Sequence, residues 1–291
     1  MFGELAAVIA PVVICAGIGF LWARLKRPFE TEFVTVLVTQ VATPCLVAST
    51  LTRLELELDA LAAMAGAAAA VFAIVGAISI AGLRAAGRPL HSYLPALLFP
   101  NAGNMGLPLC LFAFGEAGLA LAIVFFAVSS TLQFTLGVGI AAGSFAPGRL
   151  ARVPLLYALA IALVLLATDT ELPAWIANTI ELVAGITIPL MLIALGVSLA
   201  RLGIRSLKIS LTIALARLGL GFAIALAVIW ALNPPDLVAK VLLIQSSMPV
   251  AVFNYLFAHV YKRRPEEIAG AVVLSTLISF ATLPLLLLLV L

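Results

Sequence analysis

The sequence predicts an all-α polytopic membrane protein in which ten transmembrane helices form two inverted five-helix repeats, with one helix of each repeat broken and crossing its counterpart. Three observations predict this class: an apolar composition, an alternation of basic residues between successive loops, and an internal repeat at an offset of 145 residues. Of the 291 residues, 64% are hydrophobic and 10% are charged, and the mean hydropathy is +1.25. This composition excludes a water-soluble globular protein of this length.

Apolar stretches of 16 to 28 residues recur along the whole chain, separated by short polar segments. Because a helix needs roughly 20 apolar residues to cross a bilayer, we predict ten spans: 5–22, 32–51, 60–83, 91–114, 116–143, 153–168, 173–199, 209–232, 236–260 and 268–291. The first span lacks a basic n-region and a cleavage site, so we expect it to be retained. Cys15, Cys45 and Cys110 fall inside spans and are expected to be buried thiols rather than disulfide partners.

The charged residues differ between alternate loops. Thirteen basic residues lie in or beside the loops that follow the odd-numbered spans: Arg24, Lys26, Arg27, Arg84, Arg88, Arg149, Arg152, Arg201, Arg205, Lys208, Lys262, Arg263 and Arg264. The opposite side carries Arg53 and gathers acidic residues: Glu55, Glu57, Asp59, Glu116, Asp169 and Glu171. By the positive-inside rule the basic loops are cytoplasmic, so both termini are expected outside. The net charge of +3 is then explained by topology and does not indicate nucleic-acid binding.

An internal repeat relates the two halves of the chain, residues 1–145 and 146–291. At an offset of 145 residues Pro44 superposes on Pro189, and Ser130-Thr131 superposes on Ser275-Thr276, without a gap. Five helices per repeat is an odd number, so the second copy must be inverted in the membrane. Inverted repeats with broken helices are a recurring plan of secondary transporters, whose sites lie near the midplane at the repeat interface.

A polar, kink-prone segment interrupts the span 91–114 and reads Pro100-Asn-Ala-Gly-Asn-Met-Gly-Leu-Pro108. Its prolines and glycines break the helical hydrogen bonding, and such a break persists in a membrane only where it is buried in protein or lines a cavity. The repeat maps it onto residues 245–253, which predicts a second break near Met248-Pro249. We expect the two broken helices to cross at mid-depth. Their N-terminal ends would then face an anion, and their free carbonyl groups could face a cation.

Polar side chains at and around these breaks are the candidate substrate ligands. Amide and hydroxyl groups beside an unwound turn offer donors and acceptors to a ligand, although helix capping is an alternative role for the two asparagines. The candidates are Asn101, Gly103, Asn104, Gly106, Gln245, Ser246, Ser247, Asn254, Gln40 and Thr43. The expected helix breakers are Pro108, Pro249, Pro44 and Pro189. Ser130, Thr131, Ser275 and Thr276 are candidates for a second layer behind the site, with helix packing as the alternative.

Arg217 and Glu181 are charged residues that lie well inside predicted spans. For Arg217 three roles stay open: snorkelling to the interface, a structural ion pair, and binding of a substrate carboxylate. Glu181 is a candidate proton-coupling group, with solvation near the outer surface as the alternative, which we favour. No metal-ligand spacing is present, so no metal or other cofactor is expected, while coupling to H⁺ or Na⁺ stays open.

At its breaks the chain resembles the auxin efflux carrier family of the bile-acid/auxin transporter superfamily. The matching stretches are Asn101-Ala-Gly-Asn104-Met-Gly106-Leu-Pro108, Pro189-Leu-Met-Leu-Ile-Ala-Leu-Gly196-Val-Ser-Leu and Met248-Pro249-Val-Ala-Val-Phe-Asn254-Tyr. The resemblance implies a secondary carrier of small organic anions, such as malate or malonate in bacterial members. It also implies an elevator motion, and often a homodimer. The implied scaffold consists of the spans 5–22, 32–51, 153–168 and 173–199, and the other six spans form the moving domain. We accordingly expect a protein of the bacterial inner (plasma) membrane, surrounded by lipid.

Enzyme classes are excluded by content, because the sequence contains no HExxH, GxSxG, Walker A or Rossmann glycine pattern. A sodium–proton antiporter would need an ionisable carboxylate at the breaks, and residues 100–108 and 245–255 contain no Asp or Glu. The alternatives that remain are a substrate sensor built on a transporter fold, a channel, and an ion-coupled symporter of the bile-acid type.

Overall fold

A computed structural model describes residues 2–53, 58–144, 154–168, 170 and 172–291, and these residues are helical apart from short connections. Several sequence features lie outside the described residues: the boundary between the repeats, and the loop residues Glu55, Glu57, Arg149, Arg152, Asp169 and Glu171. The helices are α1 (Phe2–Arg24), α2 (Thr31–Leu37), η1 (Val38–Ala42), α3 (Thr43–Arg53), α4 (Leu58–Ala85), α5 (Leu90–Leu98), η2 (Ala102–Gly106), α6 (Leu107–Leu132), η3 (Gln133–Gly137), α7 (Val138–Ala142), α8 (Pro154–Ala167), α9 (Ala174–Ala184), α10 (Thr187–Arg201), α11 (Leu207–Leu232), α12 (Asp236–Ser246), α13 (Val252–Val260) and α14 (Pro265–Val290).

Seven helical stretches in the described chain are long and apolar enough to cross a membrane. They are Gly3–Arg24, Thr31–Thr52, Leu58–Ala85, Ala102–Ala142, Ala174–Arg201, Leu207–Leu232 and Pro265–Val290. The predicted spans 91–114 and 236–260 are interrupted, and the predicted span 153–168 corresponds to the 14-residue helix α8. The structure therefore establishes an all-helical membrane fold, while the number of ten transmembrane helices stays a prediction.

A sharp bend inside α6 coincides with a predicted span boundary. Gly115 has φ 66° and ψ −158°, which is not helical, and the predicted spans 91–114 and 116–143 meet at this residue. A residue with a side chain rarely adopts such a conformation, whereas glycine adopts it at no steric cost. The bend therefore divides α6 into the two segments Leu107–Phe114 and Glu116–Leu132.

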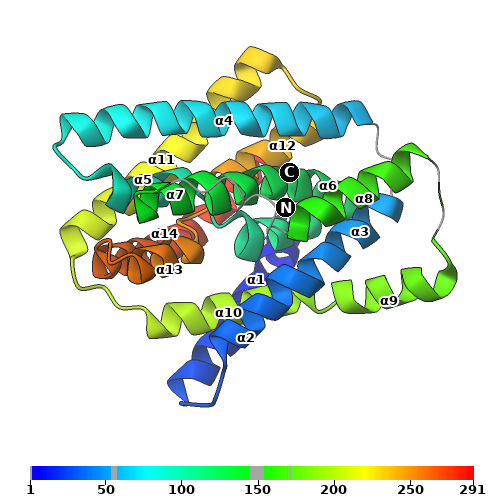
Figure 1. Cartoon of the computed structure of the whole chain (residues 1–291), viewed down its shortest axis with the longest axis horizontal. Coiled ribbons are helices and arrows are strands. Elements are labelled where there is room, and N and C mark those ends of the chain that lie inside the picture. Colours follow the sequence, from blue (N-terminus) through cyan, green and yellow to red (C-terminus); the bar gives the residue numbers. More distant parts are fainter. Residues whose placement is uncertain (1, 54–57, 145–153, 169, 171) are drawn as a thin grey trace.

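The helices pack as two groups. The first packing group consists of α1, α2, η1, α3, α8, α9 and α10, in which α1 lies along α10 and α3 contacts α8 and α9. The second packing group consists of α4, α5, η2, α6, η3, α7, α11, α12, α13 and α14, in which α11 contacts α4 and α14 while α12 contacts α6. In Figure 1, α4 lies in the upper part of the view, whereas α2 and α10 lie in its lower part. The groups meet where α6 contacts α1 and α3, and where η2 contacts α10.

The contact between α1 and α10 is unusually close. A Cβ atom added at Gly19 would lie 2.0 Å from the carbonyl oxygen of Ile193, and one added at Gly196 would lie 1.8 Å from that of Ala16. Both obstacles are backbone atoms, so they cannot turn aside as a flexible side chain would. Small residues allow helix backbones to approach in membranes, where dispersion contacts replace the hydrophobic effect as the main attraction between helices. The two glycines therefore set the spacing of this helix pair.

Candidate functional site

Two helical interruptions, far apart in the sequence, lie against each other. The first separates α5 from η2, and the second separates α12 from α13. The N–H group of Asn101 donates a hydrogen bond to the carbonyl oxygen of Pro249 at 2.7 Å, and the N–H group of Ala251 donates to that of Phe99 at 3.2 Å. Pro100 and Val250 thereby form an isolated antiparallel bridge. Both interruptions occur where the sequence predicts a break.

The interruptions redirect backbone donors that a continuous helix would use internally. In an uninterrupted helix the N–H groups of Asn101 and Val250 would donate to the carbonyl groups four residues earlier. The N–H group of Asn101 bonds to the carbonyl oxygen of Pro249 instead, and that of Val250 donates to the hydroxyl oxygen of Ser275 at 3.1 Å. Ser275 therefore has a specific structural role, because its hydroxyl group pairs a buried backbone donor that would otherwise be costly.

The carbonyl groups released by the interruptions accept hydrogen bonds from Arg217 of α11, whose side chain is 1% exposed. Its Nη1 donates to the carbonyl oxygens of Leu97 at 2.9 Å and Leu98 at 3.1 Å, and its Nη2 donates to that of Ser246. One guanidinium group thus joins the C-terminal ends of α5 and α12. Neither the snorkelling nor the ion-pair role considered for Arg217 describes this arrangement.

Asn254 of α13, in the second half of the chain, forms a side-chain hydrogen bond to the first interruption. Its Nδ2 donates to the carbonyl oxygen of Phe99 at 3.1 Å, and its Oδ1 accepts a hydrogen bond from Nε2 of Gln133 at 3.0 Å. The side chain of Asn254 is 2% exposed. Both ends of its amide are therefore engaged within the protein, so the structure places Asn254 as a support of the break, although the sequence predicts a ligand contact.

A narrow cavity of about 60 Å³ lies beside the first interruption, between the two packing groups. One wall comes from the first packing group, with Val34, Thr35, Val38, Thr39, Met191 and Ala194. The other wall comes from the second packing group, with Pro100, Asn101, Gly103, Asn104, Phe126, Ser129, Gln133, Ala251 and Phe253. The cavity thus brings together three of the predicted ligands, Asn101, Gly103 and Asn104.

Asn101 lines this cavity and carries an unused side-chain donor. Its side chain is 4% exposed, and its Nδ2 has no hydrogen-bond partner among the described residues. The helical segment that follows begins at Ala102 with the N–H groups that have no acceptor within a helix. Gly103 keeps this turn close to α6, since an added Cβ atom would lie 2.9 Å from Cε2 of Phe126. Backbone and amide donors at a helix N-terminus suit a negatively charged group.

The comparison with protein families agrees with this geometry. A family model described as membrane transport protein matches residues 140–287, which is half of the chain. The chain belongs to this family. This result confirms the resemblance indicated by the sequence motifs, and it identifies the chain as an integral membrane protein.

The membrane transport family protein is also similar to the uncharacterized transporter MJ1031 of Methanocaldococcus jannaschii, with 28% identity over 201 residues. The aligned residues make up 64% of this chain and 63% of that protein, so the match spans just under two thirds of its length. The family match includes Arg217 and the second interruption, while the cavity residues Asn101 and Asn104 precede it.

The second interruption of this membrane transport family protein holds a buried polar cluster, formed by Gln245, Ser246 and Ser247. Gln245 is fully buried, and none of the three side chains has a hydrogen-bond partner within the described part of the chain. Gly106 gives Gln245 its space, because an added Cβ atom would lie 2.1 Å from the side-chain Oε1. These predicted ligands and Gly106 lie outside the set of residues that line the cavity. Unpaired buried polar groups are costly, so their retention favours a role with a water, an ion or a substrate.

The structure does not bring Gln40 and Thr43 to the cavity. Gln40 is exposed, and Thr43 is buried with its hydroxyl group unpaired among the described residues. The wall is formed instead by α2 and η1, through residues such as Thr35 and Thr39. A π-helical turn, Val38–Ala42, lies just before Pro44 and inserts an extra residue into the helix. The cavity residues Val34, Thr35, Val38 and Thr39 keep a regular helical spacing and share one face, and Gln40 lies on another face.

The remaining predicted residues have structural or peripheral positions. Pro44 and Pro108 lie directly after the π-helical turns η1 and η2, inside continuous helical stretches, whereas Pro189 lies in the first turn of α10, where a missing N–H group costs little. Thr131 and Thr276 each donate a 2.7 Å hydrogen bond to the carbonyl oxygen four residues earlier, and Ser130 is buried, as in the packing alternative. Glu181 is exposed on α9, away from the cavity.

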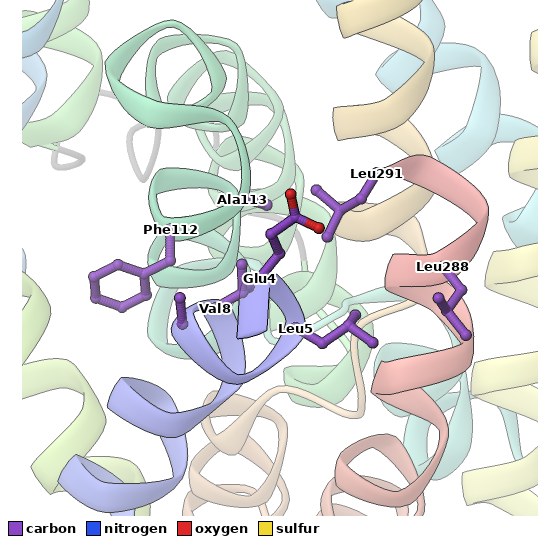
Figure 2. Close-up of a pocket in the computed structure, with 8 residues that line it drawn as sticks. Glu4, Leu5, Val8, Phe112, Ala113, Leu288 and Leu291 are labelled. Atoms are coloured by element: carbon purple, nitrogen blue, oxygen red, sulfur yellow. The ribbon is translucent and has the colours of Figure 1, made fainter. Parts of the chain in front are cut away.

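A larger cavity of about 480 Å³ lies between α1, α6 and the end of α14. Figure 2 shows the carboxylate of Glu4 beside Ala113 and Leu291, with Leu5 and Leu288 nearby. Its other lining residues are apolar, and none is a predicted ligand. In the described ranges no three His, Cys, Asp or Glu side chains gather to hold a metal ion.

Proposed function

We propose that this protein is a secondary transporter that moves a small organic anion, a mono- or dicarboxylate, by elevator-type alternating access. The observation that carries the proposal is the cavity between the two packing groups, where the unpaired amide of Asn101 adjoins the N-terminal turn of η2. A carboxylate oxygen there would accept hydrogen bonds from the Asn101 amide and from backbone N–H groups. Hydrogen bonds to a charged acceptor are roughly twice as strong as those between neutral groups.

The dimensions and lining of the cavity favour a small substrate. Its volume of about 60 Å³ suits a carboxylate group and is narrow for a steroid such as a bile acid. Asn104 and Ser129 line the same cavity and carry further polar groups. We therefore propose a mono- or dicarboxylate rather than a bile-acid-like substrate.

The arrangement of the helices supports the proposed elevator motion. The first packing group contains the spans expected for the scaffold, and the second contains those expected to move, with the cavity at their boundary. The proposed ten-helix inverted repeat is supported by helix starts at matching positions. Leu107, which begins α6 after η2, and Val252, which begins α13, are 145 residues apart. An anion held by the second group at this boundary would move with it past the first group.

We further propose a homodimer in the bacterial inner membrane with both termini outside. The decisive experiment is uptake into proteoliposomes of a panel of labelled mono- and dicarboxylates, with and without imposed pH or Na⁺ gradients. Saturable uptake of a carboxylate supports the carrier. Binding without flux would indicate a sensor, and flux that does not saturate would indicate a channel.

The orientation is tested by cysteine accessibility in a variant in which Cys15, Cys45 and Cys110 are replaced by alanine. An impermeant thiol reagent is expected to label Thr170→Cys from outside in intact cells, and Glu266→Cys only after the membrane is opened. Both positions are exposed in the structure, so each thiol can react once the reagent reaches it. The opposite pattern of labelling would reverse the topology derived from the loop charges.

Glu181→Gln is expected to leave both substrate exchange and the response to a proton gradient in place. The physical reason is that Glu181 is exposed on α9 and lies apart from the interruptions and from the cavity, so its carboxyl group is not placed to couple a proton to the movement of a substrate there. Uptake with and without an inward proton gradient measures this directly. Intact exchange combined with a lost gradient response would instead identify Glu181 as the coupling group.

A further inference from the structure

The guanidinium group of Arg217 forms its hydrogen bonds with backbone carbonyl groups. It donates to the carbonyl oxygens of Leu97, Leu98 and Ser246, and it forms no ion pair with any described carboxylate. It is also not among the residues that line the cavity at Asn101. Its charge is therefore balanced by peptide dipoles rather than by an acidic side chain or a substrate.

The helix dipoles account for this balance. The helices α5 and α12 end at Leu98 and Ser246, and each helix C-terminus carries about half a negative elementary charge. Two such ends that meet at one point amount to about one negative charge, which a single guanidinium group neutralises. In transporters with broken helices, carbonyl groups and helix C-termini of this kind coordinate the coupling Na⁺ or H⁺.

We propose that Arg217 is a tethered cation that takes the position of a coupling cation at the two interruptions. This inference rests on the proposed transport function and deepens it. A covalently held charge cannot dissociate, so the carrier has a permanently filled cation position. The consequence is that Na⁺ does not drive uptake through this position. Arg217 acts as a positioning residue that holds the two helix ends together.

The fold makes room for this contact through Gly221, which lies one helical turn after Arg217. A Cβ atom added at Gly221 would lie 2.0 Å from the carbonyl oxygen of Ser246 and 2.4 Å from Nη2 of Arg217. The first of these atoms belongs to the backbone, so α12 would have to move away. A glycine here lets the end of α12 approach α11 closely enough for the guanidinium group to reach it.

The test compares wild type, Arg217→Ala and Arg217→Lys in choline, Na⁺ and millimolar guanidinium chloride at equal ionic strength. The first readout is the thermal unfolding midpoint in detergent, which does not depend on any substrate. Wild type is expected to unfold at the same temperature in Na⁺ and choline. Arg217→Ala is expected to unfold at a lower temperature in choline and to be restored by guanidinium, which fits among the freed carbonyl groups.

The second readout is uptake of labelled malonate, or of the best substrate in the carboxylate panel. Wild-type uptake is expected to be equal in Na⁺ and choline. Arg217→Ala is expected to lose about tenfold or more in choline and to recover with guanidinium. Arg217→Lys keeps the charge and remains independent of added cations, and it provides the comparison if Arg217→Ala does not fold. If the Arg217→Lys variant also requires an added cation, the inference is wrong.

Two further outcomes would overturn the inference. One is a wild-type uptake or unfolding temperature that rises specifically with Na⁺, because a filled position cannot bind it. The other is an Arg217→Ala protein that is unchanged in choline, or reduced without any response to guanidinium. Absence of uptake of every carboxylate in the panel by wild type would count against the proposed function, whereas the unfolding measurements would still decide the role of Arg217.

Discussion

Asn101→Ala is expected to lower carboxylate uptake by about tenfold or more. A hydrogen bond to a charged group contributes about 1.5–3 kcal/mol, and 1.4 kcal/mol corresponds to a factor of ten. Asn101 lines the cavity, and its buried Nδ2 atom has no partner among the described residues. A hydrogen bond from this donor to an anion would therefore replace no existing hydrogen bond within the described protein. Asn104→Ala is expected to have a similar effect, because Asn104 lines the same space.

The same substitution is expected to change stability little. The amide of Asn101 donates to no described group, so its removal leaves no buried acceptor unpaired. The backbone bond from Asn101 to Pro249 does not depend on the side chain.

Asn101→Asp should lose more uptake than Asn101→Ala, since it replaces a donor by a negative charge that repels an anion.

Gln40→Ala provides the matched control, because Gln40 is exposed and is not a cavity residue. Uptake by this variant is expected to equal that of wild type. Uptake into proteoliposomes, together with unfolding temperatures in detergent, separates binding from folding. Wild-type uptake in both Asn101→Ala and Asn104→Ala would place the substrate site elsewhere.

Gly19→Ala and Gly196→Ala are each expected to destabilise the folded protein substantially. The added methyl group would approach a backbone carbonyl of the partner helix, at Ile193 in the first case and at Ala16 in the second. Forcing extra volume into a packed contact typically costs about 1–3 kcal/mol. We expect the upper part of that range, because α1 and α10 must separate as rigid bodies.

Gly17→Ala is the matched control on the same helix. No described atom lies within 4 Å of a Cβ atom placed at Gly17, so the methyl group finds open space. Alanine also favours a helix by roughly 0.8–1 kcal/mol over glycine, so this variant is expected to unfold at the same or a slightly higher temperature. Thermal unfolding in detergent compares the three variants. Equal unfolding temperatures for Gly17→Ala and Gly196→Ala would show that the close contact does not set the stability of this helix pair.

The sequence alone was sufficient for the all-helical membrane fold and for the positions of the breaks. Apolar runs long enough to cross a bilayer predict helices by simple partition into lipid. The Pro100–Pro108 segment and Pro249 predict the interruptions, because proline removes a helical donor and clashes with the preceding turn. The internal repeat then associates the two breaks, and the structure joins them through the contacts of Asn101 and Ala251. These properties are local or periodic, so they can be read from residue order.

Only the tertiary structure decided which side chains share the site. The roles of Asn254 and Ser275 depend on which donors and acceptors come within hydrogen-bond distance of the breaks. The position of Gln40 outside the cavity depends on how the helix is turned in the fold: Val34, Thr35, Val38 and Thr39 share the face toward the cavity, and Gln40 lies exposed on another face. The contacts of Arg217 show most clearly what cannot be predicted from the sequence. Its partners are main-chain carbonyl oxygens of two other helices, and carbonyl groups are present at every residue, so no residue type in the sequence marks them.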